Sequence, residues 1–253
     1  PIYNIGLAWK ISGPLDRSLL QRAINSVANR HESFRMLLSA HDELARQSYL
    51  KHINLALPVH DFSGQPDADQ AARHHMHQAF SQPFDLKDGL LWESQLVISS
   101  PDCHYWLLRH HHLMTDGFGL ALIVHAVADA YNALASENEA LADGASYIDF
   151  IAEDQEYLTS PRFERDREYW YQRYQKLPDP LFTLKNRENE EKVLPSGQID
   201  WVVPRAHWNR LNQFAIDHGY SIMHLIMTGI AACYARLNQN DQIIIGDQIA
   251  GRT

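Results

Sequence analysis

The chain has 253 residues, of which 45% are hydrophobic, and its formal net charge is -9. This length and apolar content can bury a sizeable core, in one large domain or in two lobes. The acidic balance argues against a general nucleic-acid binder, because such a protein needs clustered Lys and Arg to displace counterions from phosphates. Cys103 and Cys233 stand alone, so we expect neither a disulfide framework nor a Cys-based metal site.

The hydropathy pattern gives no run of about 20 consecutive apolar residues, the length that a membrane-spanning helix needs. The first residues, Pro1-Ile2-Tyr3-Asn4, lack the basic and apolar regions of a secretion signal. We therefore expect a soluble, cytoplasmic protein that binds neither nucleic acid nor membranes.

Strands and helices alternate along the first part of the chain. Residues 3–12 predict a strand that ends at Gly13-Pro14, and residues 15–31 predict a helix with Asp16 at its N-cap. The further elements predicted up to residue 110 are strands at 34–38, 44–50, 90–98 and 104–110 and a helix at 67–80.

The second part of the chain is mainly helical. Gly117 and Gly119 open a predicted helix that runs to residue 135. The polar stretch 179–197 predicts a linker or an exposed crossover. The other predicted elements are helices at 147–158, 162–177, 207–218 and 222–237, the last capped by Ser221, and strands at 198–203 and 242–246. This alternation indicates an α/β protein, with a mixed sheet as compatible as a parallel one.

The heptapeptide His111-His112-Leu113-Met114-Thr115-Asp116-Gly117 is the strongest chemical signal in the sequence. It lies between a mostly apolar predicted strand and the predicted helix that follows, so we interpret it as an active-site turn. Imidazole, with an ordinary pKa of about 6.5, can accept a proton near neutral pH. A shared zinc ion is disfavoured because adjacent residues of a strand point to opposite faces.

The pattern His-His-x-x-x-Asp-Gly resembles the core motif of condensation domains of nonribosomal peptide synthetases and of related chloramphenicol acetyltransferase-type enzymes. Other stretches resemble further motifs of this family in the same order along the chain. They are Asn29-Arg30-His31-Glu32-Ser33-Phe34-Arg35, Pro83-Phe84-Asp85-Leu86, Tyr147-Ile148-Asp149-Phe150, Tyr169-Trp170 with Leu177-Pro178, and the strand ending Ala250-Gly251-Arg252.

The resemblance implies a two-lobed, chloramphenicol acetyltransferase-like α/β fold, of which the chain covers the first lobe and the start of the second. We expect residues 1–178 to form the N-terminal lobe, 179–197 the linker and 198–253 the truncated beginning of the C-terminal lobe. The implied reaction joins a carrier-bound acyl or peptidyl thioester donor to a carrier-bound amino acid through an amide bond. Phe118-Gly119-Leu120 after the motif resembles condensation domains of aryl-capped siderophore assembly lines.

The resemblance also assigns roles to individual residues. His112, the second histidine of the motif, is the expected tunnel-facing catalytic group, and His111 is expected to pack inward and hydrogen-bond to the backbone. Asp116 is expected to brace the loop, and Gly117 to leave space for the thioester. Arg35 is the expected partner of Asp116, and Arg30 a second supporting residue, with a helix-end role equally open.

The implied partners are an upstream donor carrier domain, a downstream acceptor carrier domain and an adjacent adenylation domain. The chain itself is expected to bind no cofactor and no metal, because 4'-phosphopantetheine arrives on the carriers. Two alternatives stay open within enzymes, an epimerisation domain and a stand-alone acyltransferase of the same motif. A third, from another class, is a catalytically silent domain that only docks carrier proteins.

Overall fold

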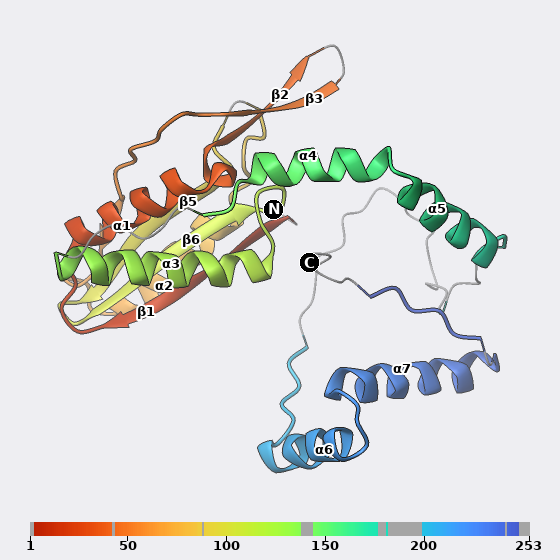
Figure 1. Cartoon of the computed structure of the whole chain (residues 1–253). Helices are drawn as coiled ribbons and strands as arrows, with labels where there is room; N and C mark the ends of the chain where they lie inside the picture. The colour runs from red at the N-terminus through yellow and green to blue at the C-terminus, as the bar shows by residue number, and fades with distance from the viewer. Residues whose placement is uncertain are drawn as a thin grey trace, which may run out of the picture. The chain divides into compact units, whose positions relative to one another are not determined.

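The computed structural model describes residues 3–41, 44–87, 89–137, 144–176, 181, 199–240 and 242–247. The chain divides into two compact units, Pro1–Ser160 and Pro161–Thr253. Apart from Leu181, the expected linker at 179–197 lies outside the described residues, so the predicted domain boundaries stay a prediction. Figure 1 labels the helices α1 to α7 and the strands β1, β2, β3, β5 and β6.

The first unit is built on a mixed four-stranded sheet with the strand order β1-β6-β5-β4. β6 pairs antiparallel with both β1 and β5, whereas β4 runs parallel to β5 at the edge. A separate antiparallel hairpin is formed by β2 and β3. The strands are β1 (Asn4–Ser12), β2 (Met36–His41), β3 (Leu44–Tyr49), β4 (Val59–Asp61), β5 (Trp92–Ser100) and β6 (Cys103–His111).

Helices cover both faces of this sheet. The helices α1 and α3 pack on one face and share its main core, whereas α2 packs on the other face through Ala72 and Met76. The side chain of Asp16 caps α1, as predicted, by accepting from two backbone amides of the first turn. The remaining elements of the first unit are α1 (Arg17–Arg30), η1 (Glu32–Arg35), α2 (Ala68–Ser81), α3 (Gly117–Ala135) and α4 (Tyr147–Leu158).

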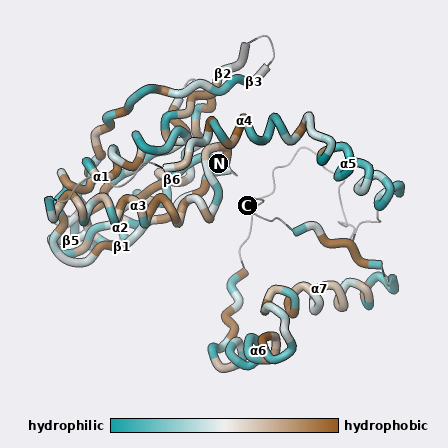
Figure 2. Tube along the Cα trace, viewed as in Figure 1, coloured by the Kyte–Doolittle hydropathy of each residue, from teal (hydrophilic) through white to brown (hydrophobic). Residues whose placement is uncertain are grey.

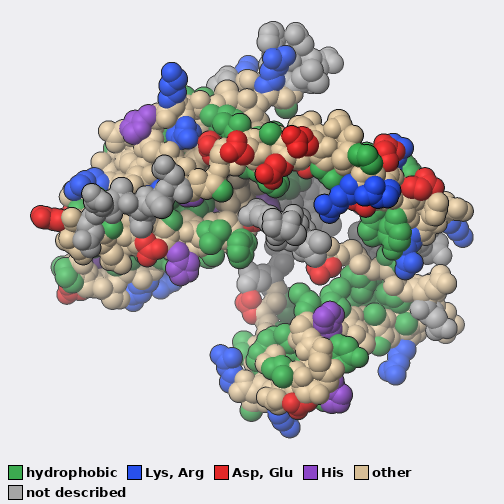
Figure 3. Space-filling model, in the orientation of Figure 1, with side chains coloured by type: hydrophobic (Ala, Val, Ile, Leu, Met, Phe, Trp, Pro, Cys, Tyr) green, Lys and Arg blue, Asp and Glu red, His purple; other side chains and the backbone are tan. Residues whose placement is uncertain are grey.

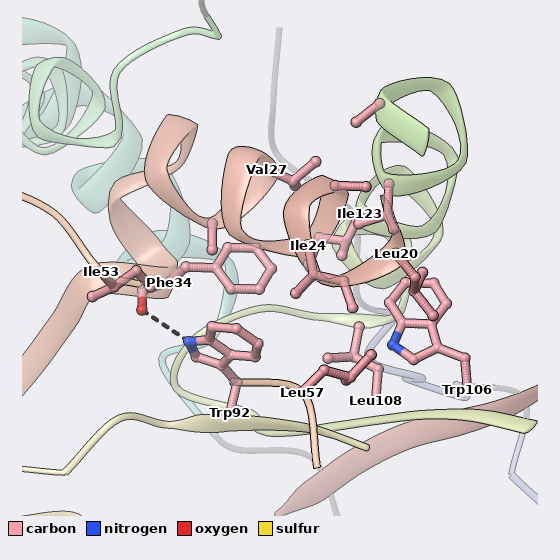
Figure 4. Close-up of a cluster of buried hydrophobic side chains, with 14 of the residues drawn as sticks. Leu20, Ile24, Val27, Phe34, Ile53, Leu57, Trp92, Trp106, Leu108 and Ile123 are labelled. Carbon is pink, nitrogen blue, oxygen red and sulfur yellow. Dashed lines mark hydrogen bonds between the residues drawn. The ribbon is translucent and has the colours of Figure 1, made fainter. Parts of the chain in front are cut away.

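The main core is a set of aromatic and aliphatic side chains between α1, α3 and the sheet (Figure 4). The Trp92 and Phe34 rings meet edge to face at 4.8 Å, and the indole N–H of Trp92 donates to the carbonyl oxygen of Phe34 at 2.9 Å. That hydrogen bond satisfies the one polar atom of a buried indole. It also ties the short helix η1 to the start of β5.

A row of amide side chains on α1 fixes the extended segment that leads into β4. Asn29 donates to and accepts from the backbone of Ile53, and Asn25 does the same for Leu55, four residues along the helix. Gln21 accepts from the amide of Leu57, one further turn away. Three side chains on one face of α1 therefore supply the backbone hydrogen bonds that this segment would otherwise form with a neighbouring strand.

The helix α3 is, within the described part of the chain, the one helix long and apolar enough to cross a membrane by length and composition alone. Core helices of soluble proteins pass the same test. Figure 2 shows hydrophobic residues along α3, and Leu120, Ile123, Val127 and Ala130 from this helix are buried against the core. The outer side of α4, in contrast, carries several acidic side chains (Figure 3).

The second unit contains the helices α5 (Pro161–Arg173), α6 (Arg205–Asp217) and α7 (Ile222–Asn238). Gly219, with a φ of 74°, ends α6 in the left-handed conformation, and the amide of Tyr220 donates back to Ala215. Ser221 caps α7, as predicted, in a capping box with His224.

The strands expected at 198–203 and 242–246 are wrong for the residues that the structure describes, since 199–204 and 242–247 have no regular secondary structure. Ile199 and Trp201 are 96% and 85% exposed. A strand needs a hydrogen-bonded neighbour, and the described part of the second unit offers these segments none. β-propensity alone therefore did not produce a strand.

Candidate functional site

The His-His motif forms the turn that joins β6 to α3. β6 ends at His111, and α3 begins at Gly117. Backbone hydrogen bonds hold the turn from three sides: His111 donates to the carbonyl of Leu91 at 2.8 Å, His112 to that of Tyr3 at 2.8 Å, and Met114 to that of His111 at 2.9 Å. The turn is thus anchored to the residues directly before β1 and β5, the two strands that flank β6.

The two motif histidines differ in exposure and in contacts. His112 is exposed to solvent. His111 is half-buried between the rings of Tyr3 and Phe84, at centroid distances of 5.8 and 6.4 Å. Its Nδ1 accepts from the amide of Leu113 at 3.2 Å, which assigns the ring proton to Nε2. Burial, followed by the charge of His112, lowers the pKa of His111.

A third histidine, His110, is buried directly before the motif, with 1% of its surface exposed. Neither of its ring nitrogens has a hydrogen-bond partner in the structure. Burial is the main cause that lowers its pKa to about 4; His112 and His111 act in the same direction, and Asp116 opposes them. His110 is therefore neutral at physiological pH.

Asp116 is the N-cap residue of α3. Its Oδ1 accepts from the amide of Gly119 at 2.7 Å, which satisfies one of the free donors of the first helical turn. A Cβ atom on Gly119 would collide with Oγ1 of Thr115, so a larger residue at this position would force the Thr115 side chain to move. A Cβ on Gly117 would meet nothing within 4 Å, so open space lies beside the start of α3.

Arg35 hydrogen-bonds to the backbone, and its expected pairing with Asp116 stays a prediction. Its Nη1 donates to the carbonyl oxygens of Leu50 and Lys51, where the chain leaves β3. Its Nε is buried without a hydrogen-bond partner. The guanidinium therefore fixes the exit of the β2–β3 hairpin.

The segment from Arg30 to Arg35 links several elements of the first unit. Arg30 is the last residue of α1 and is half-buried. The carboxylate of Glu32 accepts from the amide of Tyr147 at 3.0 Å and from the hydroxyl of Ser146 at 3.2 Å. These contacts bring the early family-like motif against the start of α4, where the Tyr147-Ile148-Asp149-Phe150 motif begins.

The structure gathers His111, His112, Asp116 and Gly117 in one turn, whereas Arg30 and Arg35 lie at the junction of α1, η1 and β2. Among the described residues, no group of three His, Cys, Asp or Glu side chains could hold a metal ion. A cavity of about 400 Å³ lies between α1, residues 55–58 and the first half of β5. Trp92 in its wall is the cross-strand neighbour of His110.

The sequence interpretation missed the residues that support the turn from the α2 side of the sheet. Arg109 is 5% exposed and sits among apolar residues of β6, on the same face as His111. A charged residue inside an apolar run signals a buried ion pair, but the sequence does not name its partner. Glu93 and Phe84 supply the contacts, at sequence separations of 16 and 25.

Comparisons with known proteins agree along the whole chain. A family model described as "Condensation domain" matches residues 1–253. The dimodular nonribosomal peptide synthase of Bacillus subtilis (strain 168) is 28% identical over 254 residues, which cover 100% of this chain and 11% of that protein. Tyrocidine synthase 3 of Brevibacillus parabrevis is 25% identical over 259 residues, or 99% of this chain and 4% of that protein.

Solved structures give the same answer for the fold. The starter condensation domain of rhizomide synthetase is 28% identical and superposes with a TM-score of 0.67, over 72% of this chain and 44% of that one. VibH, described as an NRPS condensation enzyme, is 25% identical with a TM-score of 0.60, over 70% of this chain and 41% of that one. The chain thus spans less than half of these solved domains and has the first lobe of their chloramphenicol acetyltransferase-like fold. With a family match along all 253 residues and the His-His turn at the junction of β6 and α3, the chain belongs to the condensation-domain family of nonribosomal peptide synthetases.

Proposed function

We propose that this chain supplies the catalytic turn of a condensation domain, and that the complete protein forms an amide bond between a carrier-bound acyl or peptidyl thioester and a carrier-bound amino acid. The observation that carries the proposal is the turn itself. It exposes His112 while His111 and the Asp116 cap hold the backbone on either side of it. Open space beside Gly117 leaves room for the thioester.

The chemistry requires one proton to move from nitrogen to sulfur. The acceptor amine attacks the thioester carbonyl carbon, so a C–N bond forms and a tetrahedral adduct results. When the adduct collapses, the C–S bond breaks and the pantetheine thiol leaves with a proton, while the amide nitrogen loses one. An exposed imidazole within reach of both atoms can hold that proton or orient the amine, and general base catalysis of this kind contributes about 10²- to 10⁴-fold in rate.

The partners follow from the same proposal. We infer an upstream donor carrier, a downstream acceptor carrier and an adenylation domain nearby; the multidomain synthetases that the chain resembles support this arrangement. A variant of the rhizomide domain is described in complex with C8-CoA and Leu-SNAC, an acyl donor and an amino acid thioester of the kind proposed here. A cytoplasmic location fits two unpaired cysteines, Cys103 and Cys233. The siderophore-type donor stays a prediction.

The test uses the complete protein with its carriers. An acyl donor is loaded on the upstream carrier and an amino acid on the downstream one, and the intact mass of the downstream carrier is followed over time. We expect a mass gain equal to the acyl group in the wild type and its loss, by about 10²- to 10⁴-fold in rate, in His112→Ala. His74→Ala, which removes an exposed histidine from α2, is the matched control and should keep wild-type turnover.

Other results would assign a different function. No mass gain from correctly loaded partners, with deuterium from the solvent appearing at the Cα of the acyl donor, would indicate epimerisation. Carrier binding without any chemistry would indicate a docking domain. Wild-type turnover by His112→Ala would refute the catalytic assignment.

A further inference from the structure

A cluster formed by the buried Arg109, the exposed Glu93 and the ring of Phe84 lies next to the proposed catalytic turn, on the face of the sheet that α2 covers. Its centre is Arg109, whose side chain is 5% exposed. Nε donates to Oε2 of Glu93 at 3.0 Å, Nη2 forms an ion pair with the same oxygen at 2.7 Å, and Nη1 donates to the carbonyl of Gln82 at 2.6 Å. All three guanidinium nitrogens are thus used, which fixes the plane of the group.

The guanidinium also lies over the ring of Phe84, 4.4 Å from its centroid. The rings of Phe84 and His111 are in turn nearly perpendicular, with an angle of 88° between their planes and 6.4 Å between their centroids. The backbone just before Phe84 is held as well, because Asn4 on β1 donates to the carbonyls of Phe80 and Gln82 at 2.7 Å. Phe84 therefore has a fixed position between Arg109 and the first motif histidine.

His111 transmits this position to the turn. Its Nδ1 accepts from the amide of Leu113, and its carbonyl accepts from the amide of Met114. If the His111 ring rotates, its hydrogen bond to the amide of Leu113 is lost. His112 lies between His111 and Leu113 in the chain, so this hydrogen bond limits the positions that the backbone of His112 can take.

We propose that Arg109 is a positioning residue for catalysis: through Phe84 it holds the His111 ring in the orientation that fixes the backbone of the turn and the place of His112. This rests on the proposed function, in which His112 acts on the reacting atoms. The neighbouring positions on the same face of β6, Tyr105 and Leu107, are buried in an apolar cluster against α2. An apolar side chain could fill the space that Arg109 occupies. The planar guanidinium differs because its hydrogen bonds fix the orientation of its plane, and with it the surface that faces the Phe84 ring.

Two variants test the two contacts on which the proposal depends, that of Arg109 with Phe84 and that of Phe84 with His111. Arg109→Lys keeps a positive charge and loses the fork and the stacking, and Phe84→Leu keeps an apolar side chain and loses both ring contacts. In the condensation assay with the complete protein, we expect kcat to fall about 10- to 100-fold with KM for both loaded carriers unchanged, because small misplacements of a catalytic group have effects of this size. Phe84→Tyr keeps the ring and should restore kcat.

The matched control is Arg73→Lys on α2. Arg73 also pairs with a carboxylate, that of Asp69, and also lies over an aromatic ring, 5.6 Å from the centroid of Tyr105, but its side chain is 64% exposed. Its hydrogen bonds and ring contact in the described part of the chain are to Asp69 and Tyr105, so we expect wild-type kcat.

Residue-resolved hydrogen exchange gives a second readout that needs no activity. The amide of Leu113 should exchange faster in Arg109→Lys and Phe84→Leu than in the wild type, while the amides paired between β1 and β6 keep their protection. If the wild-type protein proves inactive in condensation, the proposed function fails. The exchange measurement still tests whether Arg109 and Phe84 hold the hydrogen bond between His111 and Leu113. Unchanged kcat and unchanged Leu113 exchange in Phe84→Leu would overturn the proposal, as would loss of protection throughout β6, which would show a purely structural role.

Discussion

His110 gives the protein an acid-sensitive core, and the size of the effect follows from its pKa. In the unfolded chain an imidazole has a pKa of about 6.5. In the fold, burial lowers the pKa of His110 to about 4. As the pH falls, the unfolded chain binds the proton first, so protonation favours unfolding. The stability linked to neutral His110 is complete above pH 6.5 and is lost progressively as the pH falls towards 4.

The expected loss from this one group between pH 7 and pH 5 is about 2 kcal/mol in the free energy of unfolding. His110→Met removes the titration and fills a similar volume with an adaptable apolar side chain. It also removes two buried nitrogens that lack partners, so at pH 7 we expect it to stabilise the fold by about 1 to 3 kcal/mol. The variant should therefore gain more stability over wild type at pH 5 than at pH 7.

The measurement is urea unfolding of the complete protein at both pH values, read by a short protease pulse and the survival of peptides from β6. All other titrating groups are common to wild type and variant, so the difference between the two proteins isolates His110. His74→Met, at an exposed position of α2, is the control and should show no pH-dependent difference. Equal losses of stability in wild type and His110→Met between pH 7 and pH 5 would refute the reasoning.

Two further substitutions test the scaffold of the turn. Gly6→Ala places a methyl group against the carbonyl oxygen of Leu108 and 2.8 Å from Cα of Arg109, so the β1–β6 pairing must shift, and we expect a loss of about 1 to 3 kcal/mol in urea unfolding. Gly64→Ala, where the added methyl meets nothing within 4 Å, should leave the midpoint unchanged. Asp116→Ala removes the cap of α3 and should lower stability by about 1 kcal/mol, whereas Asp116→Asn keeps a capping oxygen and should lose less. An equal loss in the Asn variant would show that the negative charge of Asp116 matters more than its capping hydrogen bond.

Much of the fold was predictable because its signals are local. The spacing of apolar residues and the cap at Asp16 gave α1, and Ser221 gave the start of α7. The position of the turn was predictable because the motif that begins at His111 lies between an apolar strand and an apolar helix that starts at a glycine. The helix 67–80 was right to within one residue at each end.

The rest depends on pairs of residues that are distant in the sequence. The hydrogen bonds of Arg35 to the carbonyls of Leu50 and Lys51 were not predicted, because they lie at the exit of a hairpin whose geometry no local pattern specifies. The strand expected at 198–203 failed for the same reason, since pairing needs a neighbour that the segment itself does not encode.

The last residues of β6 carry two unfavourable groups, one on each face of the sheet. His110 is buried without partners towards α1 and α3, and Arg109 is buried as a charge towards α2. Two apolar residues would satisfy local packing with less desolvation. Departures from the most stable choice concentrate where a structure serves a function, and here both stand immediately before the histidine turn. In the proposed positioning role the Arg109 cluster orients His111, so we expect its removal to lower activity more than stability. Both ring nitrogens of His110 lack hydrogen-bond partners, so we expect its removal to raise stability. Opposite signs of these two effects would separate a functional buried group from a tolerated one.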